Sequence, residues 1–166
     1  IARDLKDAFF AFHGFNPSPS EERSWANSLR ALSSAIQLGG FTDHGILLEY
    51  QLPLSSRRLD AMLTGHGHDG TPAAVIVELK QWTDCEPSTV EECVVVRYGG
   101  RPKAVLHPSA QARQYRDHLA DGHTAFHDDA IRLDASAFRL RPPHPSTERP
   151  RETSSISSRS SRDAPR

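Results

Sequence analysis

Two carboxylates and a lysine, carried on two stretches with the character of strands, have the types and spacing that metal-assisted chemistry requires. Asp60 interrupts an apolar stretch, and Glu78 and Lys80 end the next one. Because side chains alternate between the faces of a strand, Glu78 and Lys80 share a face with Ile76. If residues 65–72 form a hairpin turn, Asp60 lies beside Glu78. Two neighbouring carboxylates repel each other, and a hard divalent cation such as Mg²⁺ or Mn²⁺ relieves that repulsion through its oxygen ligands.

The lysine and a pair of residues on the following helix extend this pattern. A lysine in such a site can hold, or help deprotonate, a water that attacks a phosphodiester, while the metal stabilises the charge that develops on the phosphate. Gln111 and Tyr115 are four residues apart, on one face of the last predicted helix. Their amide and phenol can contact a phosphate or support a catalytic carboxylate. The candidate catalytic residues are therefore Asp60, Glu78, Lys80, Gln111 and Tyr115, with Asp60 and Glu78 as metal ligands.

Taken singly, each of these motifs is ordinary. A Glu-x-Lys pair is typical of a solvated strand face, where it contributes about 0 to 1 kcal/mol. A Gln-x-x-x-Tyr pair is typical of a helix surface. Their succession after Asp60 is what favours a functional interpretation.

Three arginines near the candidate residues are predicted to contact phosphates. Arg57 and Arg58 precede Asp60 on its strand, and Arg113 lies on the helix that carries Gln111. Guanidinium groups bind phosphate oxygens by charge and by bidentate hydrogen bonds. The alternative is that all three are solvated surface residues.

Several other polar residues have a structural interpretation that we favour over a functional one. His66, His68 and Asp69 fall in the segment GHGHDG, which is typical of an exposed hairpin loop rather than a metal site. Glu49 either adds a carboxylate to the site or is a solvated strand residue, and we favour the latter. His107 is interpreted as a helix-start residue.

The candidate residues are positioned by a predicted order of helix, helix, strands and helix. A short amphipathic helix ends at Gly14, and a second begins at Ser18, with Glu21 completing a capping box. The last helix is predicted between an N-cap at Ser109 and a stop at Gly122. The strands are predicted at residues 46–52, 57–63, 73–80, 93–98 and 103–106. This order predicts an α/β or α+β domain with one central sheet flanked by helices.

The length of the chain, 166 residues, suits one domain and a tail. We place the domain at residues 1–130 and a low-complexity tail, disordered or truncated, at residues 131–166. After about Phe138 the sequence is dominated by Pro, Ser, Arg and Glu, and it has little apolar surface to bury.

The composition excludes some classes of partner and site. With 20 basic and 21 acidic residues the net charge is −1, so any nucleic-acid surface must be a local patch. Cys85 and Cys93 are too few for a zinc site or a disulfide framework, and they fit a reducing compartment. The chain has no apolar run near the roughly 18 to 20 residues of a membrane helix, and its start lacks the features of a secretory signal. We expect a soluble, cytoplasmic protein of undetermined oligomeric state.

Through these motifs the sequence resembles the PD-(D/E)XK nuclease superfamily, and within it the RecB-like branch. Asp60, Glu78-x-Lys80 and Gln111-x-x-x-Tyr115 match that branch in order and in predicted context, although the aspartate follows leucine rather than proline. Most of the sequence between about residues 20 and 127 is similar to an N-terminal domain of bacterial proteins in which a DNA/RNA helicase domain follows.

The resemblance implies a restriction-endonuclease-like core, in which helices flank a central mixed sheet. It also implies metal-dependent cleavage of nucleic acid, with DNA as the expected substrate and a helicase domain as a partner. The family's first motif is an acidic residue on an early helix, for which Glu21 and Glu22 are both candidates. The alternative is a catalytically silent nucleic-acid-binding or interaction domain derived from a nuclease-helicase protein. The strandedness of the substrate, DNA versus RNA, and endonuclease versus exonuclease action stay open.

Overall fold

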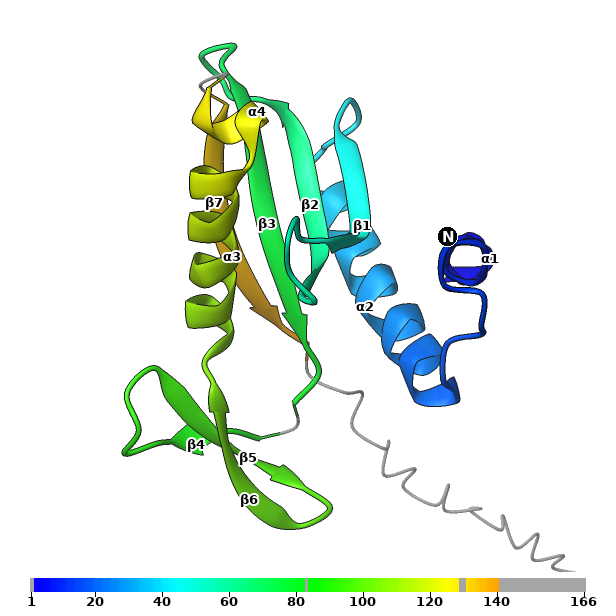
Figure 1. Cartoon of the computed structure of the whole chain (residues 1–166), viewed down its shortest axis with the longest axis vertical. Coiled ribbons are helices and arrows are strands. Elements are labelled where there is room, and N and C mark those ends of the chain that lie inside the picture. The colour runs from blue at the N-terminus through cyan, green and yellow to red at the C-terminus, as the bar shows by residue number, and fades with distance from the viewer. Residues whose placement is uncertain (1, 83, 129–130, 141–166) are drawn as a thin grey trace, which may run out of the picture.

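The computed structural model describes residues 2–82, 84–128 and 131–140, which form helices on both sides of a sheet and a smaller sheet outside it (Figure 1). In chain order the elements are α1 (Ala2–His13), α2 (Pro19–Leu38), β1 (Gly45–Gln51), β2 (Arg58–His66), β3 (Pro72–Lys80), β4 (Glu86–Pro87), β5 (Cys93–Tyr98), β6 (Arg101–Leu106), α3 (Pro108–Gly122), α4 (Thr124–His127) and β7 (Arg132–Arg139).

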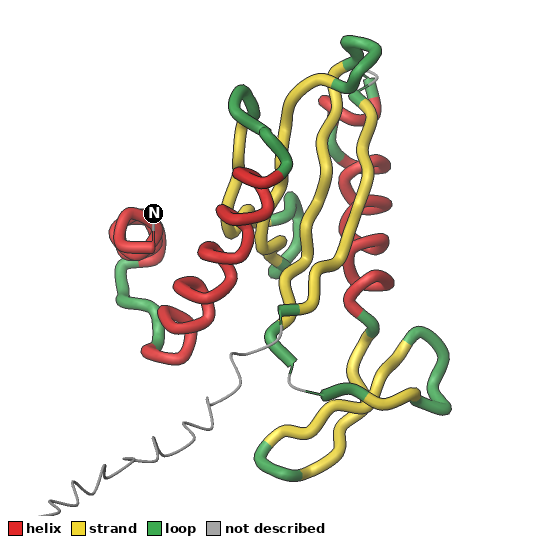
Figure 2. Tube along the Cα trace, turned by 180° about the vertical axis from the view of Figure 1, so that it is seen from behind, coloured by secondary structure: helices red, strands yellow, loops and turns green. Residues whose placement is uncertain are grey.

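The main sheet is mixed, with strand order β1-β2-β3-β7. β1, β2 and β3 are antiparallel neighbours, and β7 returns parallel to β3. Figure 2 shows α2 and α3 on opposite faces of this sheet. The prediction of one central mixed sheet flanked by helices is therefore confirmed in its coarse form, with a second sheet, β4-β5-β6, added to it.

The ends of the two long helices follow from their capping residues. Ser18 Oγ accepts a hydrogen bond from Glu21 N (3.2 Å) at the start of α2, as the capping box predicts. The prediction of Ser109 as the N-cap of α3 is wrong, because His107 takes that position and its Nδ1 accepts from Ser109 N (3.1 Å). Pro108 then occupies the first helical position, where its missing N–H costs no hydrogen bond. The interpretation of His107 as a helix-start residue is confirmed.

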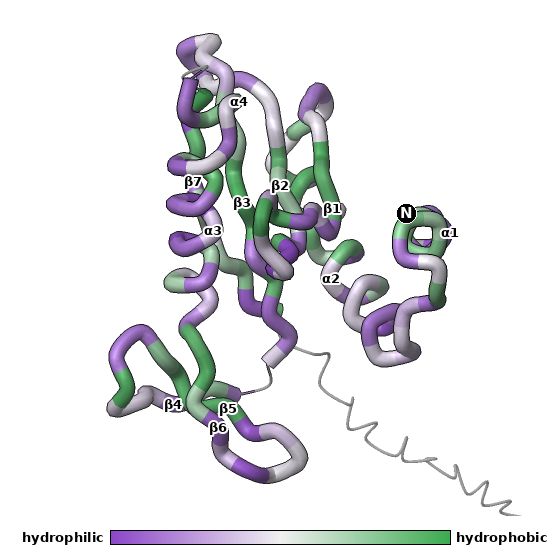
Figure 3. The backbone as a smooth tube through the Cα atoms, viewed as in Figure 1, coloured by the Kyte–Doolittle hydropathy of each residue, from purple (hydrophilic) through white to green (hydrophobic). Residues whose placement is uncertain are grey.

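The core consists of one apolar cluster on each face of the main sheet. Between the sheet and α3 lie the buried residues Leu52, Leu59, Met62, Ala74, Ile76, Tyr115 and Leu119. Between the sheet and α2 lie Leu32, Ala61 and Leu79. Hydrophobic residues recur along β1, β2 and β3 accordingly (Figure 3). The predicted alternation is confirmed: Ile76 faces α3, whereas Val77 and Leu79 face α2.

The boundary between the domain and the tail, placed after residue 130, is wrong for the first ten residues of the predicted tail. β7 pairs with β3 over its whole length, from Ala73–Arg132 to Lys80–Arg139. Its odd-numbered residues Leu133, Ala135 and Ala137 are half-buried, so a short apolar stripe stabilises the strand on one face. Residues 141–166 of the predicted tail lie outside the described residues.

Other predictions about the chain have the following outcomes. The hairpin between β2 and β3 is confirmed, and it comprises the loop between His66 and Pro72. The two-residue strand β4 was not predicted. Both cysteines are free thiols. In the described parts of the chain, no helix is long and apolar enough to cross a membrane.

Candidate active site

The candidate catalytic residues meet at one end of the main sheet. Glu78 and Lys80 lie at the end of β3, and Gln111 lies in the first turn of α3. In Figure 1 these two element ends lie together, next to the smaller sheet β4-β5-β6. A hydrogen bond between Gln111 and Glu78 joins the two element ends.

Glu78 is the centre of a hydrogen-bonded group. Its side chain is 1% exposed, and its Oε1 lies 2.6 Å from Lys80 Nζ. Gln111 Nε2 donates to Glu78 Oε1 (2.7 Å) and to Tyr115 Oη (2.7 Å). The other oxygen, Glu78 Oε2, is buried without a hydrogen-bond partner among the described residues. A buried acceptor without a partner costs about 1 to 3 kcal/mol, and more when it is charged.

Asp60 lies where the strands of the sheet separate. The ladder between β2 and β3 ends at Ala61–Val77, one position before Asp60 and Glu78 would pair. Instead, Asp60 Oδ2 accepts a hydrogen bond from Leu79 N (2.7 Å). The carboxylate of Asp60 therefore takes the place of a backbone acceptor at the end of the ladder.

The same position is irregular in the ladder between β1 and β2. Ala61 belongs to the cluster on the α2 face, whereas Leu59 belongs to the cluster on the α3 face. Residues two apart on a regular strand share a face, so β2 turns over at Asp60. Its neighbour on β1, Glu49, has a positive φ of 53° and is also left out of the pairing. A matched irregularity on the two strands thus positions both carboxylates.

Burial raises the pKa of both carboxyl groups, and the charge of Asp60 raises that of Glu78 further. The pKa of Glu78 rises from 4.5 to about 7, because of burial first and the charge of Asp60 second, with Lys80 opposing both. The pKa of Asp60 is also raised by burial, although the hydrogen bond from Leu79 and the charge of Lys80 oppose the change. A buried and a half-buried carboxyl that both resist ionisation are the electrostatic setting that a divalent cation relieves.

Lys80 is held in its charged form. Burial alone would lower its pKa, but the hydrogen bond and charge of Glu78, together with the charge of Asp60, outweigh that effect and raise the pKa. A lysine of this kind stabilises negative charge nearby and does not act as a proton acceptor at neutral pH.

A second acidic group lies beside Asp60, on the α2 side. Arg58 pairs with Glu21 (Nη2–Oε1, 2.7 Å) and with Glu49 (Nε–Oε2, 2.5 Å). These residues and Asp60 line a pocket of about 240 Å³ next to Trp25. The pKa of Glu49 rises to about 7, chiefly because of burial, with Arg58 lowering it and Asp60 raising it.

This pocket bears on two expectations about acidic residues. The interpretation of Glu49 as a solvated strand residue is wrong, because its side chain is 14% exposed and paired with Arg58. Of the two early acidic candidates, Glu21 lies in the pocket with Asp60, whereas Glu22 pairs with Lys6 (2.6 Å).

The three arginines predicted to contact phosphates all have partners in the protein. Arg58 holds the two glutamates just described and lies 5.7 Å from the ring centroid of Phe9. Arg57 Nη1 donates to Gln114 Oε1 (3.3 Å), and Arg113 pairs with Glu92. Contact of these arginines with phosphate stays a prediction, and for Arg58 it would compete with two ion pairs.

The loop between β2 and β3 is structural, as predicted. Asp69 Oδ1 accepts hydrogen bonds from Thr71 N (3.1 Å) and Thr71 Oγ1 (2.6 Å), which closes the turn. Within residues 2–82, 84–128 and 131–140, no group of three or more His, Cys, Asp or Glu side chains has the geometry of a metal site. A cation at the candidate site would therefore rest on Asp60 and Glu78, with water or substrate oxygens, as Mg²⁺ often does.

Arg139 is a basic residue near the site that the sequence analysis missed. It pairs in register with Lys80 across β3 and β7, and its Nη1 donates to Cys85 Sγ (3.2 Å). The sequence signal that could have indicated this strand is the alternation in "RLDASAFR", which is weak because two of its four apolar residues are alanines.

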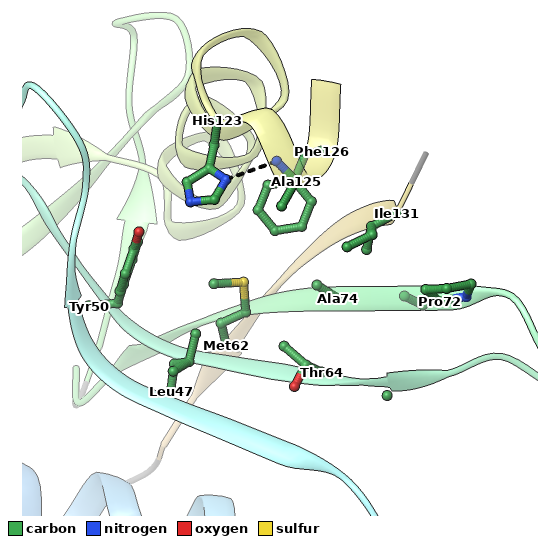
Figure 4. Close-up of a pocket in the computed structure, with 12 residues that line it drawn as sticks. Leu47, Tyr50, Met62, Thr64, Pro72, Ala74, His123, Ala125, Phe126 and Ile131 are labelled. Carbon is green, nitrogen blue, oxygen red and sulfur yellow. Dashed lines mark hydrogen bonds between the residues drawn. The ribbon is translucent and has the colours of Figure 1, made fainter. Parts of the chain in front are cut away.

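A separate apolar pocket of about 350 Å³ lies on the α3 side of the sheet, away from the candidate residues (Figure 4). Leu47, Met62 and Phe126 line it, and His123 Nδ1 at its rim accepts from Ala125 N (3.3 Å). Its lining contains none of the carboxylates described above. The candidate catalytic residues thus all lie outside this pocket.

Comparison of this chain with protein-family models, with curated proteins and with solved structures gave no match in any of the three.

Proposed function

We propose that this protein is a metal-dependent nuclease that hydrolyses phosphodiester bonds of nucleic acid, with DNA as the substrate. The observation that carries the proposal is the pairing of the half-buried carboxyl of Asp60 with the buried carboxyl of Glu78. The charge of Asp60 opposes ionisation of Glu78, and Glu78 Oε2 has no partner among the described residues. The mixed sheet between α2 and α3, and the succession of Asp60, Glu78-x-Lys80 and Gln111-x-x-x-Tyr115 along it, support a PD-(D/E)XK type of core.

The donor set fits Mg²⁺ or Mn²⁺. Both are hard cations that prefer oxygen ligands, and Mg²⁺ is commonly bound by one or two carboxylates together with water and substrate phosphate. Asp60 and Glu78 would hold the ion, which would supply the missing partner of Glu78 Oε2. When bound, the cation stabilises the negative charge that develops on the phosphate.

The remaining residues position and neutralise charge. Gln111 donates to Glu78 Oε1 and, with Tyr115 beside it, fixes the carboxylate so that Oε2 is left for a ligand. Lys80 keeps its positive charge next to Glu78, where it can orient an attacking water and stabilise the oxygen that becomes negatively charged. These are positioning and electrostatic roles, which together make up most of the catalysis of phosphate transfer.

Cleavage of labelled single-stranded and double-stranded DNA, with Mg²⁺, Mn²⁺ or a chelator, tests the proposal. We compare the parent with Lys80→Ala. The matched control is Lys6→Ala, which also removes a lysine paired with a glutamate at 2.6 Å, but on the surface.

The parent and Lys6→Ala are expected to cut DNA when metal is present and not to cut it in chelator. Cutting by Lys80→Ala is expected to be reduced at least 100-fold. Cutting that persists in chelator, or a Lys80→Ala variant as active as the parent, would overturn the proposal. Binding of DNA without cutting under every condition would favour the catalytically silent binding domain instead.

A further inference from the structure

The small sheet β4-β5-β6 projects from the main body next to the candidate active site (Figures 1 and 2). It is inserted between β3, which carries Glu78 and Lys80, and α3, which carries Gln111. Most residues of β6 are exposed, as is the far end of β5. The hairpin of β5 and β6 is therefore an arm that the fold of the main sheet does not require.

The tip of this arm is positively charged. The seven residues 97–103, "RYGGRPK", contain three basic residues and no acidic one, in a chain whose net charge is −1. Gly99 and Gly100 both have positive φ, 57° and 80°, which is the backbone of a tight two-residue hairpin turn. The charge is thus presented on a narrow, well-defined projection.

The basic side chains at the tip are available to a partner. In the described parts of the chain neither Arg101 nor Lys103 makes an ion pair, and both are exposed. Lys103 Nζ lies 5.9 Å from the ring centroid of Tyr98, whose side chain is 54% exposed. Arg97 is the exception, since it pairs with Glu86 at 3.4 Å on the surface. Exposed cations beside an exposed aromatic ring are suited to phosphates and bases.

The base of the arm is fastened to the elements of the site on two sides. Glu92, just before β5, accepts a hydrogen bond from His107 N (2.7 Å) through its backbone oxygen and pairs with Arg113 of α3 through its side chain. Cys85, just before β4, accepts a hydrogen bond from Arg139 at the end of β7. The arm therefore has a defined position beside the end of β3.

We propose that the β5–β6 arm holds the phosphate backbone of the nucleic acid next to the bond that is cut, through Arg101 and Lys103. Charge complementarity favours this occupant. Arg101 and Lys103 are exposed cations that make no ion pair among the described residues, and phosphates are the acceptors that the proposed substrate brings. The inference rests on the proposed nuclease function for its substrate, but binding by the arm can be measured without cleavage.

The test is binding of a fluorescently labelled 24-base-pair DNA duplex, and of its single strand, in chelator so that no cleavage occurs. The variant is Arg101→Glu with Lys103→Glu. The matched control is Arg23→Glu with Arg30→Glu, which changes the charge equally at exposed positions of α2, away from the arm. Thermal denaturation of each variant checks that the main domain is folded.

The arm variant is expected to bind at least 10-fold more weakly than the parent, while the control binds within about 3-fold of it. In the milder Arg101→Ala, Lys103→Ala variant, the slope of log K against log salt on the duplex becomes shallower by about 2, one contact for each residue. Equal binding by the arm variant and the parent, an equal loss in the control, or no binding by the parent overturns the proposal.

Failure of this proposal differs from failure of the nuclease proposal. If the arm variant binds and cuts DNA like the parent, the nuclease proposal stands and the proposed role of the arm is disproved. If the parent never cuts DNA but its binding depends on Arg101 and Lys103, the nuclease proposal is disproved and the binding role of the arm stands.

Discussion

Glu78→Gln is expected to change how the stability of the metal-free protein depends on pH. Glutamine has the size of glutamate but does not ionise, so the variant removes one buried carboxyl without making a cavity. The pKa of Glu78 lies at about 7 in the folded protein and at 4.5 as its ordinary value. Between these two values the folded state binds a proton that the unfolded state has lost.

The sign and size of the effect follow from this difference. Because the folded pKa is raised, the stabilisation by the protonated carboxyl is complete below pH 4.5 and is lost as the pH rises towards 7. Each pH unit in that window lowers the free energy of unfolding by up to about 1.4 kcal/mol, so the whole window amounts to about 3 kcal/mol. Glu49, whose pKa is also about 7, contributes a second slope of similar size.

The assay is urea denaturation in chelator at pH 5, 6, 7 and 8, followed by circular dichroism. The parent is expected to lose stability from pH 5 to pH 7 and then to level off. Glu78→Gln and Glu49→Gln should each remove one contribution to that slope, whereas Glu22→Gln, at an exposed ion pair, should keep all of it. A Glu78→Gln variant with the full slope of the parent would refute the reasoning, because Glu78 would then ionise normally in the fold.

Three further substitutions probe the core, a helix end and the site. Leu119→Ala, at a fully buried position of α3, should lower the free energy of unfolding by about 2 to 5 kcal/mol in urea denaturation, and a loss below 1 kcal/mol would contradict the packing. Ser18→Ala removes the N-cap acceptor of α2 and should cost about 1 kcal/mol by the same assay. Its control is Ser56→Ala, at an exposed position outside any helix. Tyr115→Phe removes the hydroxyl that accepts a hydrogen bond from Gln111. Metal-dependent cleavage should then fall at least 5-fold, while the free energy of unfolding falls by only about 1 kcal/mol. Unchanged cleavage would exclude a positioning role for the hydroxyl.

The local rules of strands and helices were enough to predict the group around Glu78. Alternation along β3 places Glu78 on the face that α3 covers, and the spacing of four residues places Gln111 next to Tyr115. The hairpin composition of the loop before β3 gives the pairing of β2 with β3. Each of these inferences needs only a regular element and one turn.

The environment of Asp60 and Glu49 could not be predicted in this way, because both strands depart from regular alternation at that position. Glu49 adopts a positive φ, which is uncommon for a residue with a side chain, and no pattern in "GILLEYQ" indicates it. The burial of Glu49 also depends on Arg58, which lies on the neighbouring strand, and on α2, which packs against this face of the sheet.

β7 was missed for a different reason. Two of its four apolar residues are alanines, so the strand has little hydrophobic signal of its own, and it precedes a polar segment. What stabilises it is the parallel ladder with β3, a contact between residues about 60 positions apart. Parallel pairing of this kind is decided by the tertiary structure and leaves only a weak mark on local sequence.

Titration of the protein with Mn²⁺ by calorimetry at pH 7.5 tests the central claim most directly, namely that Asp60 and Glu78 together hold a divalent cation. The parent and an exposed control, Glu86→Gln, are expected to bind one ion per chain. Asp60→Asn and Glu78→Gln are expected to weaken that binding at least 10-fold while remaining folded. Equal binding by all four proteins, or no binding by the parent, would contradict the claim.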